Sequence, residues 1–67
     1  MDKEELKVWM YSNYFNKYFK DMNTEQTIEV MLKDAELNLK LSKHIDKKYA
    51  LMRYEIIMNH IRALKSL

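Results

Sequence analysis

The two histidines, His44 and His60, are the side chains in this sequence best suited to hold a transition metal. Helical ligands for one metal ion stand three or four residues apart, so that both face the same side. His44 instead has a lysine four positions away on each side, and His60 has aliphatic residues there. The Glu-x-x-His pattern of di-iron helical bundles is also missing. We therefore expect no metal site and no cofactor.

Nucleophilic catalysis would need a hydroxyl group, an adjacent base and a third group that orients the base. Ser42 is the only hydroxyl near a histidine, and it stands two residues before His44. Residues two apart on a helix point in different directions. The acidic residues alternate with lysines, which is typical of solvated ion pairs. The sequence therefore predicts a protein that is not an enzyme and has no catalytic residues.

Residues 37–46, Leu-Asn-Leu-Lys-Leu-Ser-Lys-His-Ile-Asp, carry a local resemblance to one enzyme family. Ser42, Ile45 and Asp46 match the Ser-Gln-Glu-Leu-Asp signature of the Spo0E-like aspartyl-phosphate phosphatases, small helical hairpins of sporulating bacteria. Lys43 stands where that family has glutamine, His44 stands where it has an acid, and its glycine-containing loop has no counterpart here. The resemblance implies removal of phosphate from a response regulator through Asp46. It supplies our third functional hypothesis.

The aromatic cluster near the N-terminus is the candidate binding site. Trp9 projects away from the main apolar stripe of the first predicted helix, and Leu6 and Met10 lie nearby on that outer side. Trp and Tyr are enriched at the energetic centres of protein interfaces, and methionine adapts to irregular partners. Either another helix of the same chain covers Trp9, or a partner protein does. The predicted partner-binding residues are Leu6, Trp9, Met10 and Tyr14.

The elements that position these residues must be helices, because the 67 residues include no glycine, no proline and no cysteine. Tight turns and disulfides depend on those residues. We predict one all-α domain over residues 1–67, with helices at about 3–22, 24–42 and 46–66. Asn23 followed by Gln26 predicts a capping box and the clearest boundary.

The second boundary is open, because residues 43–46 are polar but contain neither glycine nor proline. A break there gives a small antiparallel three-helix bundle. Without it, the chain is a helical hairpin with one long second helix.

Apolar residues cover wide arcs on these helices, wider than the single stripe that a surface helix of a monomer buries. Chains of this length seldom bury enough surface alone to be comfortably stable. We therefore expect a homodimer to complete the bundle. The predicted core or dimer faces contain Val8, Tyr11, Phe15, Tyr18, Leu37, Leu41, Tyr54, Ile57, Ile61 and Leu64.

Composition bounds the functional class. The net charge is +2, with both signs interleaved, which favours solubility over a nucleic-acid footprint. No apolar run reaches the roughly 20 residues that span a bilayer, and the acidic start is unlike a signal peptide. We expect a cytoplasmic protein that does not act in membranes, and the Lys, Asn, Tyr and Ile usage suggests a phage or low-GC bacterium.

The function that fits best is a non-catalytic helical module for protein–protein interaction. It would act as a regulator, inhibitor or adaptor by docking apolar faces onto itself and onto a larger protein. The alternative is a nucleic-acid-binding helical dimer of the plasmid copy-control type. That function would need lysines from two subunits to gather on one face, such as Lys33, Lys40, Lys47 and Lys48.

Overall fold

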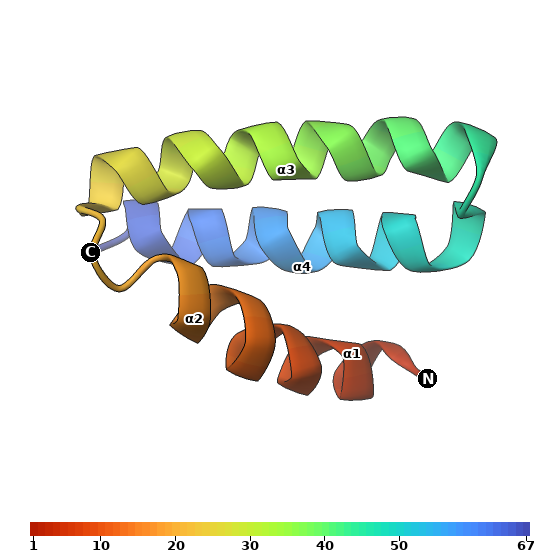
Figure 1. The fold of residues 1–67 in the computed structure, drawn as a ribbon, viewed down its shortest axis with the longest axis horizontal. Coiled ribbons are helices and arrows are strands. Elements are labelled where there is room, and N and C mark those ends of the chain that lie inside the picture. The colour runs from red at the N-terminus through yellow and green to blue at the C-terminus, as the bar shows by residue number, and fades with distance from the viewer.

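The computed structural model describes all of residues 1–67 and contains three helical rods (Figure 1). The first rod is α1 (Lys3–Met10), the π-helical segment η1 (Tyr11–Phe15) and the short α2 (Asn16–Tyr18). The second and third are α3 (Thr24–His44) and α4 (Lys47–Lys65). The protein is therefore all-helical, as predicted, and the three rods pack together.

The helix starts are fixed by side-chain caps. The Asn23 carboxamide oxygen accepts from the Gln26 amide at 2.8 Å, and the Gln26 side chain accepts from the Asn23 amide at 3.2 Å. This is the capping box that the sequence predicts. Asp2 and Glu5 form a second capping box at the start of α1. Both boxes satisfy amide groups that would otherwise lack partners in the first turn.

The connection between α3 and α4 consists of Ile45 and Asp46 alone. It lies within the predicted interval 43–46, so the chain forms three helices and not a hairpin with one long arm. No residue in the chain has a positive φ, so the turn needs no glycine. Ile45 leaves the helical geometry at φ −120°, and the Asp46 carboxylate caps the next helix by accepting from the Tyr49 amide at 3.1 Å.

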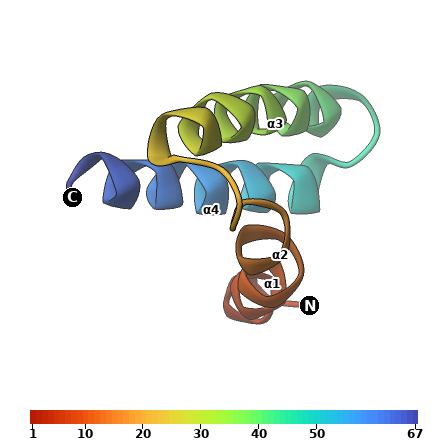
Figure 2. The same cartoon turned by 60° about the vertical axis from the view of Figure 1, so that its left-hand side comes forward.

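α3 and α4 form an antiparallel hairpin, and the α1–η1–α2 rod lies beside α4 (Figures 1 and 2). Long side chains tie this rod to the hairpin. Lys3 pairs with Glu55 of α4 at 2.6 Å, and Tyr14 donates a hydrogen bond to Asp34 of α3. The core between the rods contains Leu6, Met10, Phe15, Phe19, Met31, Ala35, Ile56, Ile57 and Ile61.

The π-helical segment decides which face of the first rod is buried. Within η1 the hydrogen bonds reach five residues back, as in the bond from the Asn16 amide to the Tyr11 carbonyl. The wider turn adds one residue to the register. Met10 and Phe15, five residues apart, therefore lie on the same buried side, which a regular α-helix would not allow.

This register shift corrects the sequence-based assignment of the first helix. Val8 and Tyr18 were predicted on a core or dimer face, and within the single chain Val8 is 66% exposed and Tyr18 is also exposed, so neither belongs to the core. Leu6 and Met10 were predicted on the outer side, but they are only 6% and 3% exposed. The prediction assumed an uninterrupted 100° step per residue from 3 to 22, and the inserted residue in η1 breaks that step.

The molecule exposes more surface than its mass requires. Its accessible surface is 4990 Å², whereas a compact monomer of 8.2 kDa exposes about 4,500 Å². The α1–η1–α2 rod covers only one side of the hairpin, which accounts for the open form (Figure 2). No helix is both long enough and apolar enough to cross a bilayer.

Candidate protein interface

Trp9 is the largest side chain that the fold leaves open, with 52% of its surface exposed. It lies between two surface hollows of about 570 Å³ and 410 Å³, and lines both. Leu6 and Met10, buried on the inner side of α1, hold the helix against α4 so that Trp9 faces outward. We call the residues around these hollows the Trp9 surface: Met1, Glu4, Glu5, Leu6, Val8, Trp9, Ser12, Asn13, Asp46, Tyr49 and Arg53.

One edge of the Trp9 surface is held by a hydrogen-bonded network from the hairpin. The Arg53 guanidinium donates to Asp46 at 3.0 Å and to the Asn38 carboxamide oxygen at 2.7 Å. Desolvation alone would raise the pKa of Asp46, but hydrogen bonds from Arg53 and from the Tyr49 amide outweigh it and lower that pKa. Asp46 and Arg53 therefore compensate each other's charge and form a fixed rim.

Of the four predicted partner-binding residues, Trp9 is the one that lies open on the surface. Leu6 reaches the floor of one hollow, and Met10 is buried in the core. Tyr14 is half-buried, and its hydroxyl donates to the Asp34 carboxylate. Burial raises the pKa of Tyr14, and the hydrogen bond to Asp34 and its negative charge raise it further. Tyr14 thus fastens η1 to α3.

The structure adds two neighbours of Trp9 that the sequence analysis missed. Tyr49 and Arg53 come from the first turns of α4 and line the same hollow as Trp9. Their place beside α1 depends on how the hairpin lies against the first rod, and no local pattern signals such a tertiary contact.

The predicted core or dimer residues divide into three groups. Phe15, Ile57 and Ile61 are buried, and Val8, Tyr18 and Leu37 are exposed. Half-buried positions are occupied by Tyr11, Leu41, Tyr54 and Leu64. The exposed group and the half-buried group are available for contacts outside the chain.

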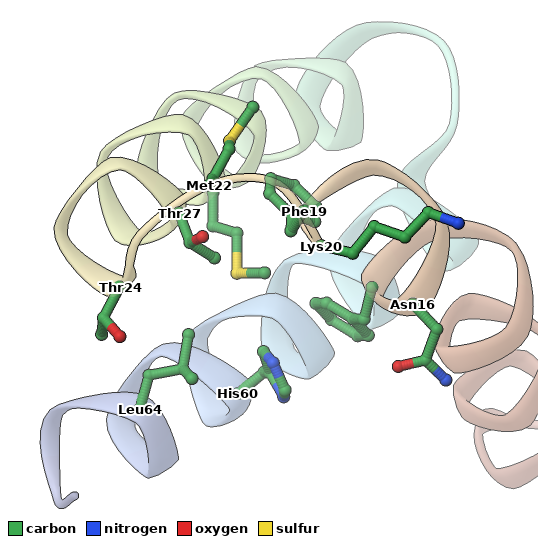
Figure 3. Close-up of a pocket in the computed structure, with 10 residues that line it drawn as sticks. Asn16, Phe19, Lys20, Met22, Thr24, Thr27, His60 and Leu64 are labelled. Atoms are coloured by element: carbon green, nitrogen blue, oxygen red, sulfur yellow. The ribbon is translucent and has the colours of Figure 1, made fainter.

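A third hollow, of about 320 Å³, opens where the end of the first rod meets the hairpin (Figure 3). Its apolar walls come from Phe15, Phe19, Met22, Met31 and Leu64. His60 and Thr27 contribute polar atoms, whereas the Lys20 ammonium and the Asn16 amide point away from the hollow (Figure 3). The arrangement contains no nucleophile paired with a base.

His60 of α4 packs against Tyr11 and Phe15 of the first rod. Its Nδ1 lies 3.0 Å from the Tyr11 hydroxyl oxygen, and its ring centroid lies 4.2 Å from that of Phe15. Burial lowers the pKa of His60 because the charged imidazolium loses hydration there. The neutral ring is therefore the form that the fold favours.

The stability of the fold should fall as the pH is lowered from 7 to 5. The folded pKa of His60 lies below its unfolded value of about 6.5, so stability is full above that value. Below it the unfolded chain binds a proton first, and stability decreases towards the folded pKa. Urea denaturation at several pH values measures the free energy of unfolding. The control is His60→Asn, which does not titrate in this range and keeps a hydrogen-bond acceptor near the position of the His60 Nδ1 atom. Equal pH dependence in both proteins would contradict the assignment.

The residues of the phosphatase resemblance have their polar atoms engaged within the chain. The Ser42 hydroxyl donates to the Leu39 carbonyl at 2.7 Å, and Asp46 caps α4 and pairs with Arg53. No three His, Asp or Glu side chains gather closely enough to hold a metal ion. Lys33 of the proposed nucleic-acid face pairs with Glu29 at 3.9 Å. Both alternative functions stay predictions.

Comparisons with protein-family models, curated proteins and solved structures find no match to this chain. The function must therefore be inferred from the molecule's own surface. The Trp9 surface combines an exposed indole, two hollows and a fixed rim, and is the candidate interface.

Proposed function

We propose that the protein is a non-catalytic helical interaction module. It acts as a regulator, inhibitor or adaptor by docking onto a larger protein through the Trp9 surface. One observation carries the proposal: Trp9 is half-exposed between two hollows on a helix whose opposite side is packed in the core. An exposed apolar patch with a polar rim is typical of protein-binding sites. Val8, next to Trp9 and 66% exposed, extends the patch.

The supports of Trp9 favour tight docking. α1 is capped at its start, packed through Leu6 and Met10, and tied to α4 by the Lys3–Glu55 pair. The Asn13 carboxamide also donates to the Trp9 carbonyl at 3.0 Å, next to the wide turn of η1. A site built on ordered helices loses little entropy on binding. Trp9 can therefore act as an energetic centre of the interface.

Self-association through the hairpin is the second part of the proposal. Leu32 lies two positions from Asp34, and therefore on the opposite side of α3 from the contact with Tyr14. We infer that apolar side chains of both hairpin helices form one apolar side, and two such sides would form a four-helix core. Its side chains, half-buried or exposed, are Ile28, Leu32, Leu39, Leu51, Tyr54 and Met58.

Replacing Trp9 with alanine should abolish capture of the partner. In a cross-linking pull-down from the native host, we expect the wild-type chain to retain one protein that Trp9→Ala loses, because removing a central Trp costs about 2 kcal/mol or more. Tyr18→Ala, at an exposed aromatic residue near the other end of the rod, is the matched control and should retain it. Equal recovery with both variants would contradict docking through Trp9.

The chain should also associate with itself at micromolar concentration. Sedimentation equilibrium is expected to give an average mass that rises with concentration towards twice 8.2 kDa. Leu51→Glu places a charge on the apolar side of the hairpin and should keep the chain monomeric, whereas Glu36→Gln should not. A wild-type mass that stays at 8.2 kDa at every concentration would contradict self-association.

A further inference from the structure

Negative charge predominates beside Trp9, where the Met1 ammonium group is the one cation at the larger hollow. The ionisable side chains that line the larger hollow are Glu4 and Glu5. Neither takes part in an ion pair, since the ion pairs of the chain are Lys3–Glu55, Lys33–Glu29 and Arg53–Asp46. Glu5 accepts a hydrogen bond from the Asp2 amide, which leaves its negative charge in place. An exposed indole therefore lies beside two carboxylates that form no ion pair.

The basic residues of α1 lie on another side of the helix. Lys3 is bound to Glu55 of α4, and Lys7 stands two positions before Trp9, so that it points away from Trp9. Both lysines line a different hollow, which Glu4 also lines together with Tyr11 and His60. In the smaller hollow, the positive charge of Arg53 is compensated by Asp46. Met1 lines both hollows of the Trp9 surface, and its amino group lies 3.4 Å from the Tyr49 hydroxyl oxygen.

We propose that the Trp9 surface binds a segment of another protein in which an apolar anchor stands beside lysine or arginine. This inference rests on the proposed function and specifies the partner's chemistry. The anchor would enter the hollow lined by Leu6, Trp9 and Tyr49. The basic side chain would lie near Glu4 and Glu5, where it also reaches the indole face for a cation–π contact.

The same charges argue against two other occupants. A two-fold contact of this surface with a second copy would bring Glu4 and Glu5 close to the same residues of that copy, and like charges at an interface cost affinity. Phosphate groups of nucleic acid would meet the same carboxylates and be repelled. Self-association through the apolar side of the hairpin leaves this surface free.

Selection of peptides from a random display library on the intact protein tests the inference. We expect the enriched peptides to be apolar with a net positive charge, and to bind Trp9→Ala about 30-fold more weakly. The double variant Glu4→Gln/Glu5→Gln should weaken binding about fivefold, and added salt should weaken it as well. Glu25→Gln/Glu36→Gln removes the same charge from α3 and should have no effect.

The outcomes separate the two proposals. Trp9 is the only tryptophan, so a blue shift of its emission reports whether a selected peptide covers it. If no selected peptide depends on Trp9, both the proposed function and this inference are overturned. Peptides that depend on Trp9 but are neutral or acidic overturn the inference alone. Basic peptides that bind Trp9→Ala and the wild type with equal affinity also overturn the inference. Circular dichroism checks that every variant is folded.

Discussion

Replacing Ile57 with alanine is expected to unfold most of the protein at 25 °C. Ile57 is 1% exposed and lies among Met31, Ala35 and Ile61, where all three rods meet in one core. Removing its side chain beyond Cβ costs about 2 to 5 kcal/mol, from lost apolar burial and from the cavity left behind. A chain of this length has a total stability of about 3 to 10 kcal/mol, and a small, open fold lies at the lower end.

The measurement is the circular dichroism signal at 222 nm, which reports helix content, during urea and thermal denaturation. Leu37→Ala is the matched control, because it shortens an exposed aliphatic side chain on α3, outside the proposed self-association side, and should change stability by less than about 1 kcal/mol. If Ile57→Ala is as stable as Leu37→Ala, the core is not where the structure places it.

Deleting Ser12 is expected to preserve the fold, whereas deleting Lys33 is expected to abolish it. Ser12 lies in η1 and is exposed. Its removal shortens the interval between Met10 and Phe15 to four residues, so a regular α-helix would keep both side chains on the buried face. Lys33 is equally exposed, but α3 has no extra residue to lose. Its deletion rotates Ala35 away from Met31 by about 100°.

Circular dichroism and the emission of Trp9 measure the outcome of both deletions. We expect native-like helicity and a cooperative thermal transition for the Ser12 deletion, and largely unfolded spectra for the Lys33 deletion. Equal loss of structure in both would show that the π-helical segment is not an accommodated insertion, and would remove our explanation for the burial of Leu6 and Met10.

Much of the secondary structure could be predicted from the sequence because it depends on local chemistry. The absence of glycine and proline predicts helices, and Asn23 with Gln26 marks a boundary that local hydrogen bonds alone enforce. The end of α3 was less accessible. Ile45 leaves the helix without any residue that forces it to, and the Asp46 carboxylate caps α4 through the Tyr49 amide while it also pairs with Arg53, seven residues later.

The buried face of the first rod could not be predicted, because no residue type or spacing between Tyr11 and Phe15 indicates a π-helical turn. The aromatic spacing fits an α-helix, and the tertiary fit of Leu6 and Met10 against α4 selects the wider turn instead. The sequence left open whether another helix of the chain covers Trp9. The structure leaves Trp9 52% exposed, because the burial of Leu6 and Met10 turns it outward. Burial patterns on helices shift as a block when one residue is inserted.

The long sequence separation of the contacts that hold the first rod affects how the chain is made. Lys3 meets Glu55 across 52 positions, and Tyr11 meets His60 across 49. During synthesis the N-terminal segment emerges first, and distant contacts must wait for their partners. Leu6, Trp9 and Met10 therefore form one uncovered apolar surface on the nascent chain until α4 has left the ribosome. The nascent chain therefore exposes a larger apolar surface than the folded protein. Packing of α4 then buries Leu6 and Met10 and leaves only Trp9 of the three exposed.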